Sequence, residues 1–334
     1  IDPEHPELVY LPGKEGWMTR FKVNYATRQW TVDAVWPFDE TDPRAGRLDR
    51  VQFIRANGRI YLAGRRSFTI YRFDGDRLVL SAGILRDRES RTVSFWHDAN
   101  GNGRSDDEEL TPTEPPGQVL TYHGQNWLED LSLLAPAQGT QDVYRLAPEG
   151  FDAHGNPIFK TWTKLFSDPM FVARTGGTAD ALHGGNELAD NFPSDWLGAD
   201  GSPDTGFYVQ ARGGKNFSAN EGPQHKLTRY VPDGKGGYVM KWRTGRTALQ
   251  RLAEPGEFYG AMRVQRPING LVSVIDQSRC GILLFTDEGL YVDTLFPDGR
   301  RVHAKDAGLY PQPGEFFAGQ LFANRDNQTI YAAM

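Results

Sequence analysis

The feature that most constrains this chain is a pattern of short apolar strands separated by polar turns, which recurs about six times. The clearest copy has apolar runs at 59–63, 68–73 and 77–80, with the turn Asp74-Gly75 between the last two. Such β-branched and aromatic runs, punctuated by Asp, Asn and Gly, are typical of strands joined by tight turns. The matching middle strands begin near residues 21, 70, 143, 227, 282 and 329.

A repeat of about fifty residues with three or four strands is typical of a β-propeller blade. We therefore expect an all-β chain, a β-propeller of about six blades, formed as a single domain over 1–334. Two intervals are longer and predict insertions at 98–118 and 175–222. The sixth copy stops mid-blade at Met334, so either the first strands complete that blade or the chain is a segment of a larger, multidomain protein.

Residues 98–109 carry the sharpest chemical signal. Side-chain oxygens occupy positions one, three, five, nine and twelve of this stretch, and position six is Gly103. This is the spacing of a calcium loop of the EF-hand type, which supplies about six to eight oxygens by wrapping around a hard dication. The expected Ca²⁺ ligands are Asp98, Asn100, Asn102, the Arg104 backbone carbonyl, Asp106 and Glu109. The alternative is a polar turn, since Asn-Gly and Asp-Asp are also common in exposed loops.

The residues that flank the loop decide which kind of calcium site it is. Thr92–Trp96 are β-branched or aromatic in alternation, as in a strand, and the prolines of 111–116 cannot continue a helix. We therefore expect the loop to lie between strands rather than between helices. Such a loop is suited to a structural staple, because a calcium sensor needs helices whose angle can change.

Two segments resemble NHL-type propeller repeats. Gly58–Ala63 followed by Thr69–Gly75, and Val274–Gly289, each have an apolar strand that leads into an Asp/Gly turn, and the second also holds Arg279 in the preceding turn. The resemblance covers about half of the chain and implies a propeller fold. The chain looks most like bacterial extracytoplasmic propeller proteins, some of which carry an Asp-x-Asn-Gly-Asn-Gly insertion. The resemblance therefore implies a secreted protein with an extracellular or periplasmic location.

Composition excludes several classes of function. A net charge of −6 argues against nucleic acid as partner, because phosphate binding needs a concentrated basic face. No run of about eighteen apolar residues is present, so no membrane span is expected. The chain starts at Ile1 rather than at methionine and shows no signal peptide, which we interpret as the result of processing or trimming. Cys280 is expected to be a small buried apolar residue rather than a reactive thiol.

Candidate catalytic chemistry is sparse. His123, His183 and His225 lie in Gly-rich or turn contexts that could face a propeller channel, although a hydrogen-bonded loop histidine is the simpler interpretation. The segment 175–222 combines Trp196 with several carboxylates and amides. Such a combination suits a sugar or a second cation site, and a decorative insertion is the alternative. No histidine pair has a short metal-ligand spacing.

Three classes of function remain. A secreted binding or scaffold module, for glycans or protein ligands, is our first choice. It requires the fewest spatial arrangements of residues that the sequence does not show. A carbohydrate-active enzyme, a polysaccharide lyase or hydrolase, would need a base and a charge neutraliser on one face. The residues to test for that role are His183, Tyr208, Arg212 and His225. A quinone-dependent dehydrogenase is compatible with the fold, but no residues select it.

Overall fold

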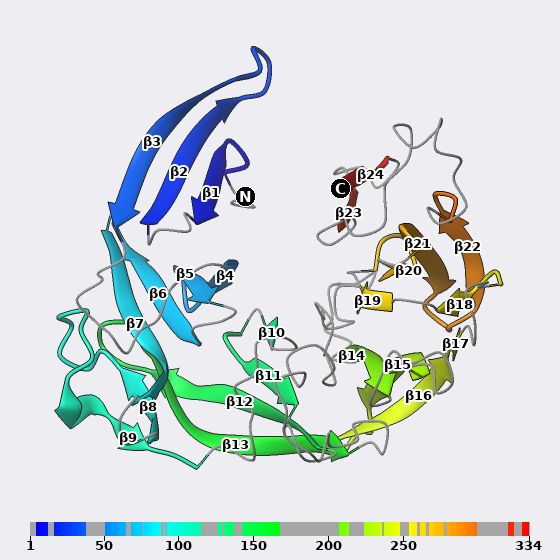
Figure 1. Ribbon diagram of the computed structural model, residues 1–334. Coiled ribbons are helices and arrows are strands. Elements are labelled where there is room, and N and C mark those ends of the chain that lie inside the picture. The colour runs from blue at the N-terminus through cyan, green and yellow to red at the C-terminus, as the bar shows by residue number, and fades with distance from the viewer. Residues whose placement is uncertain are drawn as a thin grey trace. The chain divides into compact units, whose positions relative to one another are not determined.

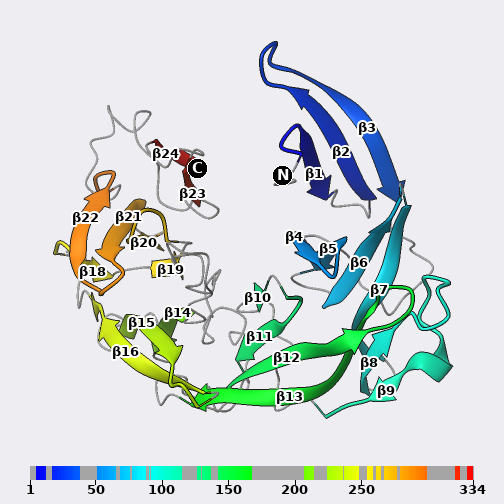
Figure 2. The same cartoon turned by 180° about the vertical axis from the view of Figure 1, so that it is seen from behind.

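A computed structural model of the chain consists almost entirely of β-strands, and the elements are labelled in Figure 1 and seen from behind in Figure 2. The structure describes residues 5–12, 17–37, 51–64, 68–75, 77–87, 90, 92–114, 126–128, 130–136, 142–167, 207–213, 224–235, 237–247, 254–258, 261–264, 267–276, 279–298, 320–323 and 329–333. Within these ranges the one helical element is the 3₁₀ turn η1 (Asp107–Glu109).

The strands form consecutive sheets in which each strand pairs with the next one along the chain. The first sheet contains β1 (Leu8–Pro12), β2 (Trp17–Asn24) and β3 (Gln29–Pro37). The second contains β4 (Val51–Ala56), β5 (Arg59–Gly64), β6 (Thr69–Asp74), β7 (Arg77–Arg86), β8 (Val93–His97) and β9 (Thr111–Pro112). The third contains β10 (Asn126–Trp127), β11 (Leu133–Pro136), β12 (Asp142–Phe151) and β13 (Pro157–Ser167).

The later sheets follow the same rule. The fourth contains β14 (Phe207–Gly213), β15 (Gln224–Pro232) and β16 (Tyr238–Thr244). The short strands β17 (Arg246–Thr247) and β18 (Glu257–Phe258) pair in parallel. The fifth sheet contains β19 (Ala261–Val264), β20 (Leu271–Asp276), β21 (Gly281–Thr286) and β22 (Tyr291–Leu295), and the sixth contains β23 (Gln320–Ala323) and β24 (Ile330–Ala333).

The prediction of an all-β chain is confirmed. Each copy of the sequence repeat corresponds to one of the sheets that follow one another along the chain, and these up-and-down sheets have the strand order of β-propeller blades. In the third copy the sequence pattern predicts a turn over Gly150–Gly155, and the predicted start of this turn is wrong. Gly150 and Phe151 belong to β12 rather than to the turn, which is limited to the residues between Phe151 and Pro157.

The chain divides into two compact units. The first comprises Ile1–Pro116, Trp127–Leu134 and Arg145–Thr163, and the second comprises Gly117–Asn126, Ala135–Tyr144 and Lys164–Met334. The assignment of one domain with two insertions stays a prediction. None of the described residues form a helix that is both long and apolar enough to cross a membrane.

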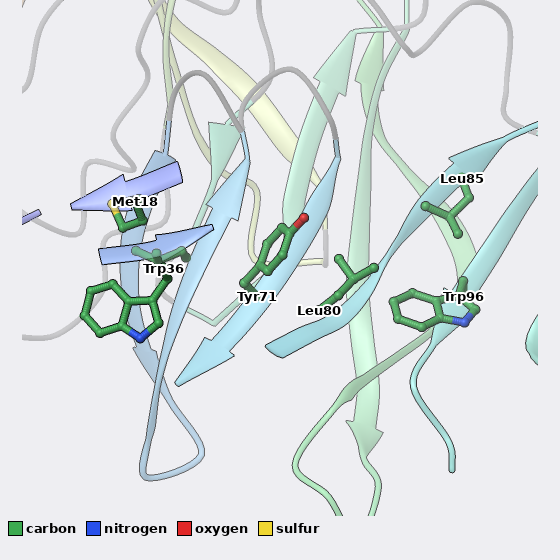
Figure 3. Packing of buried hydrophobic residues seen from close by; sticks show 7 residues of the cluster. Met18, Trp36, Tyr71, Leu80, Leu85 and Trp96 are labelled. Carbon is green, nitrogen blue, oxygen red and sulfur yellow. The ribbon is translucent and has the colours of Figure 1, made fainter. Parts of the chain in front are cut away.

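In the first unit, the inner strands β5, β6 and β8 of the sheet β4–β9 are buried on both faces. One face packs on Met18 and Trp36 of the first sheet through a cluster completed by Leu62, Tyr71, Leu80, Leu85 and Trp96, and Figure 3 shows these side chains. On the other face, Tyr61 lies against Phe151 and Phe95 lies against Trp162. Burial on both faces explains why the run 60–63 is continuously apolar rather than alternating, and why every residue of 68–71 is buried.

The second unit has its own core between the sheets β14–β16 and β19–β22. Its buried members are Leu227, Phe258, Val264, Val272, Val274, Leu283 and Phe285. The opposite face of β15 is also covered, because the Tyr230 ring stacks on Phe166 with centroids 4.2 Å apart. Cys280 is fully buried and forms no disulfide, which agrees with the predicted apolar role.

Candidate metal centre

The predicted calcium loop connects two antiparallel strands. β8 pairs with β9 through Ser94↔Pro112 and Phe95↔Thr111, and residues 98–110 form the connection between them. No helix flanks the loop, and η1 covers only its last three positions. The predicted placement between strands is therefore confirmed.

Two glycines give the loop its tight curvature. Gly101 and Gly103 have φ values of +77° and +75°, in the left-handed region that disfavours other residues. A Cβ atom at Gly103 would lie 3.0 Å from Val79 Cγ1, and one at Gly101 would lie 2.8 Å from the His154 ring. The sharp turn predicted for position six is therefore present at Gly103, and a second close approach occurs at Gly101.

Three side chains of the loop accept hydrogen bonds from backbone N–H groups further along it. Gly103 N donates to Asp98 Oδ1 at 3.0 Å, Asn102 N to Asn100 Oδ1 at 3.0 Å, and Arg104 N to Asn102 Oδ1 at 2.7 Å. These bonds fold the chain around its own oxygens. The spacing read from the sequence thus corresponds to a succession of side-chain-capped turns.

The two acidic side chains at the end of the loop complete the group. The Asn100 and Asn102 side-chain NH₂ groups donate to Asp106 Oδ2 at 2.8 and 2.7 Å, and these bonds lower the pKa of the Asp106 carboxyl. Glu109 Oε1 accepts from Asn100 N at 3.0 Å, and Glu109 Oε2 accepts from the Trp96 indole at 2.8 Å. All five predicted side-chain ligands therefore belong to one hydrogen-bonded loop.

The donor set is made of hard oxygens. Three carboxylates, two amides and the Arg104 carbonyl are available, although that carbonyl also accepts from Asp106 N at 3.2 Å. In the part of the chain that the structure describes, no three His, Cys, Asp or Glu side chains lie close enough to hold a metal by themselves. A cation at this loop would therefore depend on the amides and the carbonyl as well, a ligand set that suits Ca²⁺.

Asp98 ties the loop to the interior of the first unit. Its side chain is fully buried, and Oδ2 lies 3.2 Å from Nη1 of Arg72 on β6, whose side chain is also buried. Arg72 Nη1 donates in addition to Asn156 Oδ1, and Asn156 Nδ2 donates to the Asp98 backbone carbonyl at 2.6 Å. The loop is thus bonded to residues from two other parts of the sequence.

Sequence reasoning missed Arg72 and Asn156. A signal for Arg72 was present, because it is the one charged residue within the apolar run 68–73. Such a residue, if buried, needs a partner of opposite charge. Asn156 carried a weaker signal, four residues after Asp152 in a turn. Neither signal indicates the partner, because the contacts join residues 26 and 58 positions apart.

The catalytic candidates are placed only in part. Residues 168–206 and 214–223 lie outside the described residues, and so do His123 and His183. The register of β14 and β15 places Arg212 opposite His225 and Tyr208 opposite Arg229. Leu227, which lies opposite Gln210, is fully buried in the core.

Comparisons with known proteins do not assign the chain. No protein-family model and no curated protein matches it. The periplasmic gluconolactonase of Pseudomonas aeruginosa is similar in structure at 14% identity, with 86% of this chain and 78% of that chain covered and a TM-score of 0.41. Virginiamycin B lyase of Staphylococcus aureus gives 12% identity, 86% and 83% coverage and a TM-score of 0.38. A protein of Bacteroides fragilis with proposed 6-phosphogluconolactonase activity is 11% identical, with 89% of this chain and 83% of that chain covered and a TM-score of 0.41.

Proposed function

We propose that the Asp98–Glu109 loop binds one Ca²⁺ ion, which acts as a structural staple of the first unit. The observation that carries this proposal is the single hydrogen-bonded group formed by Asp98, Asn100, Asn102, Asp106 and Glu109 around a left-handed Gly103. The carboxylates of Asp98, Asp106 and Glu109 supply the negative charge. A bound cation would take the place of the Asn100 and Asn102 amide hydrogens as the partner of Asp106.

The chemistry of the loop favours calcium over other common metals. Zn²⁺ prefers nitrogen and sulfur ligands, and the ligand positions offer oxygen alone. Mg²⁺ demands a near-ideal octahedron and retains its water, whereas Ca²⁺ accepts irregular sets of carboxylate, amide and carbonyl oxygens. A loop held by a hairpin has no helices to reorient, so binding would stabilise the structure rather than signal. An ion at about 100 times its Kd would add about 2.7 kcal/mol to the stability of the folded state.

The test uses Tb³⁺, which substitutes for Ca²⁺ at oxygen sites and luminesces when a neighbouring indole absorbs light. Trp96 donates to Glu109 Oε2, so its indole would sensitise Tb³⁺ in this loop. We expect Tb³⁺ emission that Ca²⁺ displaces, and a Tm several degrees lower in EDTA than in Ca²⁺. Glu109→Gln should abolish both effects.

The matched control is Glu108→Gln. Glu108 is an exposed carboxylate in the same 3₁₀ turn and does not occupy a ligand position. This variant should behave as wild type. A wild-type protein whose Tm does not respond to EDTA, and which gives no Tb³⁺ emission, contradicts the proposal.

For the whole chain we propose an extracytoplasmic binding or scaffold module for a glycan or a protein ligand. The support is threefold: the calcium site proposed above, the resemblance to NHL-type repeats, and the suitability of Ca²⁺ sites of modest affinity to extracellular surroundings. We expect the protein to be retained on glycan columns in Ca²⁺. We also expect it to release no new reducing or unsaturated ends from the same polysaccharides.

A carbohydrate-active enzyme is the second candidate, and the pairing of Arg212 with His225 favours it. Arginine and histidine are residue types that can serve as a charge neutraliser and a base. Against this, Leu227, two positions after His225 on β15, is packed into the core. Cleavage of a polysaccharide that is lost in both Arg212→Ala and His225→Ala would establish this alternative.

A further inference from the structure

We infer that Asn156 is a positioning residue of the proposed calcium site, and that Ca²⁺ binding orders the β12–β13 turn at Asp152–Asn156. This inference rests on the proposed calcium site, which it deepens by naming the part of the fold that the ion would control. It follows from a chain of buried polar contacts that starts at the first ligand of the loop.

Asn156 uses every hydrogen-bonding position of its side chain. Its Oδ1 accepts from Arg72 Nη1 and from Ser81 Oγ, the latter at 2.7 Å. Its Nδ2 donates to the Asp98 backbone carbonyl at 2.6 Å and to Asp152 Oδ2 at 2.9 Å. Two donors and two acceptors are the full capacity of an amide side chain. Because Asn156 is fully buried, water cannot replace a lost partner.

Asp98 is also held by residues outside the loop. Asp98 N donates to the Ser81 carbonyl at 2.9 Å, its backbone carbonyl accepts from Asn156, and its Oδ2 faces Arg72. What remains for a cation is Oδ1, which also accepts from Gly103 N inside the loop. Residues that orient a metal ligand in this way change metal affinity by about 10–100-fold when they are removed.

Asn156 is also bonded to Asp152 at the start of the β12–β13 turn, and the turn has further hydrogen bonds of its own. Asp152 Oδ1 accepts from His154 N and Asn156 N at 2.8 Å each, and Gly155 N donates to the Asp152 carbonyl at 3.1 Å. The Gly155 carbonyl in turn accepts from the Tyr61 hydroxyl at 2.6 Å. Coupling between two sites is reciprocal, so if Asn156 helps Asp98 to bind the ion, the ion must stabilise the arrangement of Asn156.

A second turn provides an internal control. At Asp233–Gly237, Asp233 Oδ1 accepts from Lys235 N and Gly237 N at 2.7 and 2.9 Å, which reproduces the turn of Asp152. The position that corresponds to Asn156 is Gly237, which has no side chain to reach another element. The two turns therefore share this pair of hydrogen bonds and differ in the connection to the proposed calcium loop.

The experiment measures amide hydrogen exchange of the whole chain in Ca²⁺ and in EDTA. We expect Ca²⁺ to slow exchange in peptides that contain 152–156 and to leave those that contain 233–237 unchanged. Asn156→Ala should weaken Ca²⁺ binding about 10–100-fold by calorimetry and abolish the slowing. Should Asn156→Ala fail to fold, Ser81→Ala, which removes one bond to Asn156 Oδ1, should weaken binding by a smaller factor in the same direction.

The outcomes separate this inference from the proposed site. If wild type binds Ca²⁺ but the 152–156 turn exchanges at the same rate with and without it, and Ser81→Ala binds as wild type, the inference is overturned and the calcium site stands. If Ca²⁺ does not bind at all, both are overturned. If Asn156 has a purely structural role, Asn156→Ala should lower Tm equally in Ca²⁺ and in EDTA. If it is a positioning residue, the variant should show a smaller difference between its Tm in Ca²⁺ and its Tm in EDTA than wild type does.

Discussion

Replacing Arg72 tests the buried polar network directly. Arg72 is 3% exposed and Asp98 is 0% exposed, so Arg72→Met would leave the Asp98 carboxylate in the interior without its cation. Breaking a buried ion pair from one side costs about 3–5 kcal/mol. At roughly 2–4 °C per kcal/mol for a larger domain, this is about 6–20 °C in Tm. The measurement is thermal and urea-induced unfolding in EDTA, followed by tryptophan fluorescence.

A double-mutant cycle separates the pair from its surroundings. Asp98→Asn removes the charge that Arg72→Met leaves uncompensated. The double variant should therefore lose less unfolding free energy than the two single variants lose together, by about 1–3 kcal/mol. The matched control is Arg145→Met, because Arg145 pairs with Asp130 in the same unit at 34% and 52% exposure. An exposed pair contributes at most about 1 kcal/mol. An additive cycle, or a loss at Arg72 no larger than at Arg145, would refute the reasoning.

Two further predictions concern the surface. Backbone N–H groups of Lys235 and Gly237 lower the pKa of the Asp233 carboxyl, so its stabilisation is present above the unfolded pKa of about 3.9 and is lost as pH falls through the folded value. Asp233→Asn should therefore reduce acid sensitivity below about pH 4 in unfolding curves; an unchanged profile contradicts this. Trp30 is 64% exposed on the outer face of β3, so Trp30→Thr should alter stability by under about 1 kcal/mol and reduce binding of an apolar dye.

The succession of sheets could be read from the sequence because each turn carries its own signal. Gly58, Gly75, Gly234 and Gly289 follow Asn, Asp or Glu at turns between consecutive strands, and all have positive φ. Local chemistry therefore fixed where strands end. The loop at 98–109 was accessible for the same reason, since the hydrogen bonds within it join residues no more than nine positions apart.

The C-terminal end of strand β7 could not be predicted from the sequence. The prediction ended this strand at Leu80, but it continues to Arg86 through Ser81-Ala82-Gly83. These small residues resemble a turn, yet Ser81 and Ala82 are fully buried. A Cβ atom at Gly83 would lie 3.0 Å from the Phe68 carbonyl. Small side chains are needed there because another backbone approaches closely, and this requirement comes from the packed fold rather than from the segment itself.

The Arg72–Asp98–Asn156 network is better understood as a device for specificity than as a source of stability. A buried ion pair is weak evidence for stability, since apolar residues of similar volume often serve as well. The Asn156 amide, however, is fully satisfied only when β6, β7, the loop at 98–109 and the β12–β13 turn are in one arrangement. Any slip in their packing would leave at least one buried polar group without a partner. An ion bound at Asp98 would act on that same arrangement, so a small surface loop could stabilise a contact deep inside the unit.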